Sequence, residues 1–147
     1  ACWSARTQRG QLMASLRPTT ILCVDDEDVP LFLRKRVLEK SGYEVITANS
    51  ARQALTLLES RDVDLVLSDQ LMPEMTGTQL AKIIKESRTS LPFILISGVN
   101  EMPPDIAYAD VFISKLEGPV ALCQKIAEVV ARDYNVATSG SAADPGK

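Results

Sequence analysis

Three acidic residues stand where the chain could bring carboxylates together for chemistry. Asp25 and Asp26 follow an apolar run that ends at Val24, and Asp69 follows a second apolar segment, residues 63–68. Clustered carboxylates repel one another, and a cation relieves that repulsion. Oxygen ligands suit Mg²⁺, which also lets a carboxylate attack a phosphoryl group because it neutralises oxygens of the incoming phosphate. The acids therefore predict a Mg²⁺ site at which Asp69 is a nucleophile that forms an acyl phosphate.

Such a site needs elements that place these acids at one edge of the fold. Apolar runs rich in β-branched residues predict strands over residues 19–24, 43–47, 63–68, 91–97 and 110–114. Between them, segments of helical character predict helices over residues 30–40, after Ser50, over 77–87 and over 119–133. This alternation predicts a parallel sheet with right-handed crossovers and helices on both faces. Ligands of such sheets bind at the carboxyl ends of the strands.

Each predicted helix has an apolar stripe that should face the sheet. In chain order the expected inward residues are Leu33 and Val37; Ala54, Leu55 and Leu58; Leu80, Ile83 and Ile84; and Leu122, Ile126 and Val129. Leu31 and Phe32 directly precede Leu33, and three consecutive side chains cannot all lie on one face of a helix. At least one of these three should therefore be exposed beside the acidic pocket.

Composition excludes several classes of function. The 147 residues, 46% of them hydrophobic, suit one packed domain. The net charge of −3 gives no basic field for nucleic acid, and no apolar stretch reaches membrane-spanning length. Without any histidine, catalysis by histidine is excluded. Cys2, Cys23 and Cys123 lack metal-binding spacing, which favours a reducing, cytoplasmic setting.

The segment from Asp69 to Gly77 resembles the phosphoacceptor segment of response regulator receiver domains. In that family Asp-x-x-Met-Pro-x-x-x-Gly follows the third strand, and Met72 and Pro73 stand at the matching positions. The resemblance covers roughly residues 19–133. It implies a flavodoxin-like, doubly wound (βα)₅ sandwich with strand order 2-1-3-4-5, in which strands one and three lie side by side at the centre.

The resemblance also implies roles for the acidic residues. Asp69 would be the phosphoacceptor. Asp26 and Asp69 would ligate Mg²⁺ directly, the backbone carbonyl of Leu71 would add a third ligand, and Asp25 would act mainly through water. Taken alone, the acidic run from Asp25 to Asp28 also fits a solvated loop before a helix N-terminus, where acids are favoured.

Three further positions match the family at the ends of the last two strands. Ser97 matches the hydroxyl residue that donates to a phosphoryl oxygen, and Lys115 matches the lysine that pairs with the phosphoryl group and the acceptor carboxylate. Phe112 matches the aromatic switch position. Taken singly, Ser97 is a strand-end serine, Phe112 a core-edge residue and Lys115 a surface lysine, so their order and spacing carry the resemblance.

The implied function is that of a receiver module in a two-component phosphorelay, similar to the single receivers of chemotaxis. It would take its phosphoryl group from the phosphohistidine of a histidine kinase or a histidine phosphotransfer protein and then switch contacts with a downstream protein. It would bind neither nucleic acid nor membrane and would not be an enzyme acting on a separate substrate. Residues 1–18 and 134–147 are expected to be disordered.

The sequence departs from the family pattern at three places. Leu116 stands where a cis proline usually follows the lysine, and a non-proline cis bond would cost about 3 kcal/mol. Gly98 replaces the alanine common after the hydroxyl residue. Pro103 and Pro104 lie in the segment that should form the fourth helix, so that helix is expected to be shortened.

Four other readings are weighed against this one. An aspartate-nucleophile phosphatase needs a second acid two residues after the nucleophile, where this chain has Leu71. A nucleotide- or flavin-binding domain needs glycines after the first strand, where this chain has acids from Asp25 to Asp28. A pseudo-receiver that serves only as an interaction module, and a receiver excised from a hybrid kinase or a larger regulator, remain open alternatives.

Overall fold

The computed structural model describes residues 18–98 and 108–143, with side chains as far as residue 132. Five parallel strands form one sheet in the order β2-β1-β3-β4-β5. The strands are β1 (Thr20–Val24), β2 (Glu44–Ala48), β3 (Leu65–Asp69), β4 (Phe93–Ser97) and β5 (Val111–Ser114). This is the flavodoxin-like arrangement that the sequence predicted, with β1 and β3 adjacent at the centre.

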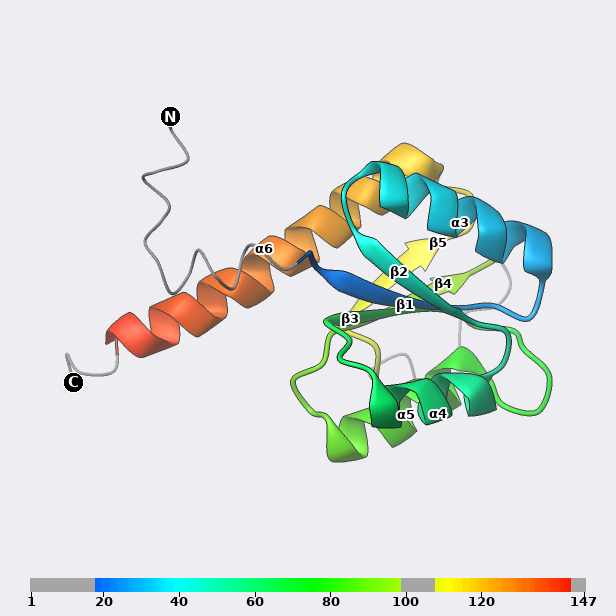
Figure 1. Cartoon of the computed structure of the whole chain (residues 1–147), viewed down its shortest axis with the longest axis horizontal. Helices are drawn as coiled ribbons and strands as arrows, with labels where there is room; N and C mark the ends of the chain where they lie inside the picture. The colour runs from blue at the N-terminus through cyan, green and yellow to red at the C-terminus, as the bar shows by residue number, and fades with distance from the viewer. Residues whose placement is uncertain (1–17, 99–107, 144–147) are drawn as a thin grey trace.

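Within the described residues, four helices cover the two faces of the sheet (Figure 1). They are α3 (Asp28–Lys40), α4 (Ala51–Ser60), α5 (Gly77–Ser87) and α6 (Pro119–Ala143). Figure 1 shows α3 and α6 on one face and α4 and α5 on the other. The predicted local signals hold at two helix ends: Ser50 accepts a hydrogen bond from the backbone N–H of Gln53 at the start of α4, and Gly42 has a φ of 97° just after α3.

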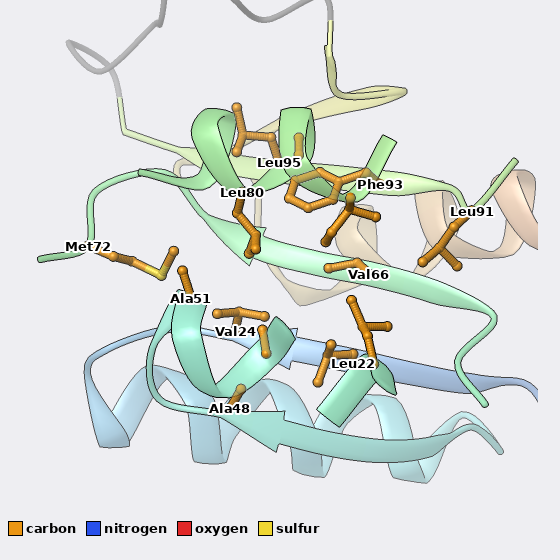
Figure 2. Close-up of a cluster of buried hydrophobic side chains, with 14 residues drawn as sticks. Leu22, Val24, Ala48, Ala51, Val66, Met72, Leu80, Leu91, Phe93 and Leu95 are labelled. Atoms are coloured by element: carbon orange, nitrogen blue, oxygen red, sulfur yellow. The ribbon is translucent and has the colours of Figure 1, made fainter. Parts of the chain in front are cut away.

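The sheet divides the buried side chains into two clusters because successive strand residues point to opposite faces. On the α4–α5 face, Leu22, Val24, Val66, Phe93 and Leu95 contribute to one cluster. Figure 2 shows part of it, with Met72 reaching from the loop after β3 toward Ala51 of α4. On the α3–α6 face the second cluster includes Ile21, Cys23, Leu67, Ile94 and Ile113.

The predicted inner face of the first helix is wrong. Leu33 is 55% exposed, and the buried residues of α3 are Leu31 and Leu38. Leu31 and Leu38 are seven residues apart, which is two helical turns, so they also share one side of the helix. Leu33 and Val37 share a different side. The expected exposed apolar side chains are present, since Phe32 is 56% exposed. In α5, Ile83 was also expected to face inward, but it is exposed.

In α4, α5 and α6 the other residues predicted to face inward are confirmed, although one of them is only partly buried. Ala54, Leu58, Leu80, Ile84, Leu122, Ile126 and Val129 are buried. Leu55 is half-buried and packs against the α4–α5 cluster.

Several expectations concern the later part of the chain. α6 continues to Ala143, ten residues beyond the end predicted near Asp133, since no proline or glycine occurs between residues 134 and 139. The bond between Lys115 and Leu116 is trans, because the described residues contain no cis peptide bond. The expected shortened fourth helix falls mainly on residues 99–107, which lie outside the described residues. The N-terminal segment predicted over residues 1–18 lies outside them as far as residue 17.

Candidate functional site

Three carboxylates converge at the carboxyl edge of the sheet, as the strand order requires. One oxygen from each of Asp25, Asp26 and Asp69 lies within 4.8 Å of the others. Asp25 follows β1, and Asp69 is the last residue of β3. Both are buried, whereas Asp26 is exposed. The cluster therefore has a buried floor formed by two acids and a third acid at its rim.

Asp25 is held by donors on both of its oxygens. Its Oδ1 accepts a hydrogen bond of 2.9 Å from the backbone N–H of Glu27, and its Oδ2 accepts one of 2.6 Å from a guanidinium nitrogen of Arg34. The side chain of Arg34 is 15% exposed and that of Asp25 is 3% exposed. Arg34 comes from α3 and was missed by the sequence analysis, although its place between the buried residues Leu31 and Leu38 marks it as inward-facing.

Asp69 faces the only other cation that the described residues place in direct contact with this cluster. The ammonium of Lys115, which follows β5, lies 2.9 Å from Asp69 Oδ1. Burial raises the pKa of the Asp69 carboxyl, the contact with Lys115 lowers it, and the charge of Asp25 raises it further, with a net upward direction. No hydrogen bond from another described group reaches the buried Oδ1. Burial therefore disfavours the ionised form of Asp69, and additional positive charge nearby would stabilise that form.

The loop after Asp69 is fastened to the start of α5. The backbone N–H of Gly77 donates to the carbonyl of Gln70, and Thr78 donates to the Gln70 side chain through both its N–H and its hydroxyl. Ser68 donates to the carbonyl of Asp69 at 2.9 Å. These bonds, with Met72 buried in the core, fix the backbone on both sides of the carboxylate.

Two further predicted positions, Ser97 and Phe112, lie on the α4–α5 face of the sheet. Ser97 is fully buried at the end of β4, and its carbonyl accepts a hydrogen bond of 2.8 Å from the backbone N–H of Lys115. Phe112 is half-buried and packs against the α4–α5 cluster. By strand alternation Ser97 follows Phe93 and Leu95 on that face. The site therefore lies at the carboxyl edge of the sheet and draws residues from both of its faces.

The structure brings Asp25, Asp26, Asp69 and Lys115 together. Ser97 adjoins them through the backbone bond to Lys115, and Phe112 lies on the neighbouring strand. The side chain of Leu71 is 52% exposed, so only its backbone could serve the site. A cleft of about 460 Å³ opens beside these residues, between α3 and the start of α6.

Comparison with known proteins gives a consistent result. The family model of the response regulator receiver domain matches residues 21–127. The response regulator SaeR of Staphylococcus aureus is 31% identical over 119 residues, which cover 78% of this chain and 51% of SaeR. Other curated relatives are covered to 34% and 21% of their lengths. The chain therefore spans about half, or less, of the curated proteins that it matches.

Solved structures match over most of their length. A CheY-like receiver domain protein from Methanospirillum hungatei has a TM-score of 0.75 and 30% identity, with 80% of this chain and 98% of that chain covered. The response regulator protein TrrA of Thermotoga maritima, solved with Mg²⁺ and BeF, has a TM-score of 0.71 and 29% identity, with 75% and 97% covered. Within the described part of the chain, no helix combines the length and apolar character needed to cross a membrane.

Proposed function

Because the chain belongs to the family of response regulator receiver domains, we propose that it accepts a phosphoryl group on Asp69 within a two-component phosphorelay. The observation that carries this proposal is the convergence of Asp25 and Asp26 with Asp69, opposite the ammonium of Lys115. A buried carboxylate that ends a strand beside a cation suits attack on phosphorus, since positive charge lowers repulsion between two anions. In this proposal the module accepts phosphate and is not an enzyme with a separate substrate.

The donor set fits a small divalent cation. Three carboxylates with oxygens within 4.8 Å of one another form the oxygen-rich site that Mg²⁺ prefers. In this proposal Asp26 and Asp69 hold the ion directly with the Leu71 carbonyl, and Asp25 supports it. When bound, the ion would neutralise charge on the phosphoryl oxygens.

The chain's own residues carry the transfer step. A carboxylate oxygen of Asp69 forms a bond to phosphorus while the bond from phosphorus to the donor's imidazole nitrogen breaks, and the electron pair returns to that nitrogen. Lys115 then lies beside the new phosphoryl group, which it stabilises as a point charge. The hydroxyl of Ser97 donates to a phosphoryl oxygen, and Phe112 turns toward the space that the hydroxyl leaves.

Labelling with a small phosphoryl donor tests this function. Incubation with acetyl phosphate and Mg²⁺ should add one phosphoryl group to the intact mass, and chelation of the metal should slow that gain by at least about tenfold. A chain that gains no phosphate at saturating donor and Mg²⁺ would exclude the proposal in favour of a pseudo-receiver.

The partner would be a histidine kinase or a histidine phosphotransfer protein, since the chain contains no histidine of its own. Leu33 lines the cleft that Asp25 also lines, and both Leu33 and its neighbour in α3, Phe32, are exposed. Leu116 and Val120, which adjoin lining residues in the sequence, are exposed as well. Exposed apolar groups rimmed by charge are typical of protein contact sites. A helix that carries the phosphohistidine could therefore pack here and present its imidazole to Asp69.

Replacing Phe32 with serine should slow transfer from a phosphohistidine donor by about tenfold, because one central apolar contact contributes on the order of 1.4 kcal/mol. Labelling by acetyl phosphate should stay unchanged. Ile83→Ser, at an exposed apolar position on α5, is the matched control and should alter neither rate. Equal slowing by Phe32→Ser with both donors would contradict a docking role.

A further inference from the structure

Arg34 is a charged residue on the side of α3 that faces the core, where an apolar residue would be expected. It lies three residues after Leu31 and four before Leu38, so the three share one face of α3. Leu31 is 7% exposed and Leu38 is fully buried. A guanidinium in such a stripe is unfavourable unless it is paired. The side chain of Arg34 meets this condition through its contact of 2.6 Å with Asp25.

This contact changes what Asp25 can offer to another cation. Oδ2 is engaged by Arg34 and Oδ1 by the backbone N–H of Glu27. Both oxygens therefore carry a donor before any metal binds, and the guanidinium cancels much of the negative charge. A divalent ion that approaches Asp25, Asp26 and Asp69 meets the positive charge of Arg34 as well as that of Lys115.

We propose that Arg34 is a resident counter-ion of Asp25, which holds the acidic pocket together without metal and competes with a divalent cation for that carboxylate. This inference rests on the cation site proposed above. It makes Arg34 a positioning residue: it sets the orientation and effective charge of Asp25 and thereby lowers the affinity of the pocket for Mg²⁺.

Two opposite effects of Arg34→Met distinguish this role from simple packing. Methionine fills similar space without charge, so it leaves Asp25 buried without its partner and should lower the melting temperature of metal-free protein by several degrees. The same change should tighten Mg²⁺ binding by about tenfold, as removal of roughly 1.4 kcal/mol of repulsion would do. Saturating Mg²⁺ should then raise the melting temperature of the variant more than that of the wild type.

Calorimetric titration with MgCl₂ and thermal melting with and without the ion measure these effects. Lys35→Met is the matched control, because Lys35 is the next residue on α3 and its ion pair with Glu39 is exposed. It should leave affinity and melting temperature unchanged. Arg34→Lys, which keeps the positive charge, should bind Mg²⁺ nearly as the wild type does. If Arg34→Met fails to fold, Arg34→Gln provides the same comparison.

A double variant tests whether the effect runs through Asp25. In an Asp25→Asn background, Arg34→Met should no longer tighten binding, because the competed carboxylate is gone. A tightening that persists there, or an unchanged affinity of folded Arg34→Met beside measurable wild-type binding, would overturn the inference alone. Absence of Mg²⁺ binding by wild type and every variant would overturn the cation site and the inference with it.

Discussion

Asp69→Asn is expected to abolish phosphoryl acceptance and to raise the melting temperature of the metal-free protein. The amide cannot form an acyl phosphate, so the intact mass should show no gain from acetyl phosphate. The same substitution removes a buried negative charge that lies against Asp25 and Asp26. Lys115 loses its ion pair with Asp69 but is 37% exposed, so water can solvate its ammonium.

The gain in stability should depend on pH in a defined direction. The folded-state pKa of Asp69 lies above its ordinary value of 3.8, chiefly because the carboxyl is buried. The stabilisation that the Asp69 carboxyl provides is therefore present below the unfolded pKa and is lost as pH rises through the folded pKa. Asp69→Asn lacks this titration, so its advantage over wild type should grow as pH rises through that window and level off above the folded pKa.

Thermal melts of both proteins in chelator, from about pH 4 to about pH 7, measure this difference. Asp62→Asn is a suitable control, since Asp62 is an exposed acid that precedes β3. It should neither block labelling nor change the pH profile. Labelling of Asp69→Asn at the wild-type level would assign the acceptor to another residue.

Gly77→Ala should strongly destabilise the domain. A Cβ at this position would collide with the carbonyl oxygen of Asp69 and would lie 2.6 Å from Cδ1 of Leu95. The first neighbour is backbone and the second is a fully buried side chain, so neither can move away easily. We expect a loss of roughly 3 kcal/mol in the free energy of unfolding, with slower labelling because the backbone at Asp69 is displaced.

Gly118→Ala provides the control for this prediction. Gly77 is the first residue of α5, and Gly118 directly precedes α6. A Cβ at Gly118, however, would meet no atom within 4 Å. The free energy of unfolding should change by less than about 0.5 kcal/mol. Urea denaturation of the two variants measures the contrast, and equal stabilities would mean that the loop can move away from α5 without loss.

The sequence predicted the sheet and its acidic edge because those features depend on strong, local patterns. An apolar run covered on both faces cannot be mistaken for a loop, and an acid at its end must emerge at the strand's carboxyl edge. Asp25 and Asp69 were therefore expected at this edge because each follows a strand, whereas the strand order and the place of Lys115 came from the family resemblance. Their roles in phosphoryl transfer stay predictions until labelling is measured.

The inner face of α3 was predicted wrongly because periodicity left two choices. Leu33 with Val37, and Leu31 with Leu38, both fit one side of a helix. The contact between Arg34 and Asp25, which are 9 residues apart in the sequence, distinguishes the two choices. Arg34 reaches Asp25 only when Leu31 faces the sheet. Pattern reasoning treats an arginine as exposed, so it missed the residue that fixes the helix rotation.

Because the core is divided into two clusters, substitutions on the two faces of the sheet should have largely independent effects on the domain. Neighbouring positions along one strand, such as Ile94 and Leu95, pack in different clusters and share few partners. Substitutions in the two clusters should then combine additively, as those at independent sites do. The sheet separates the two sides of the core. Under the proposed function, the α3–α6 side can then adapt to a new phosphoryl donor while the α4–α5 side, against which Phe112 packs, adapts to a different downstream protein.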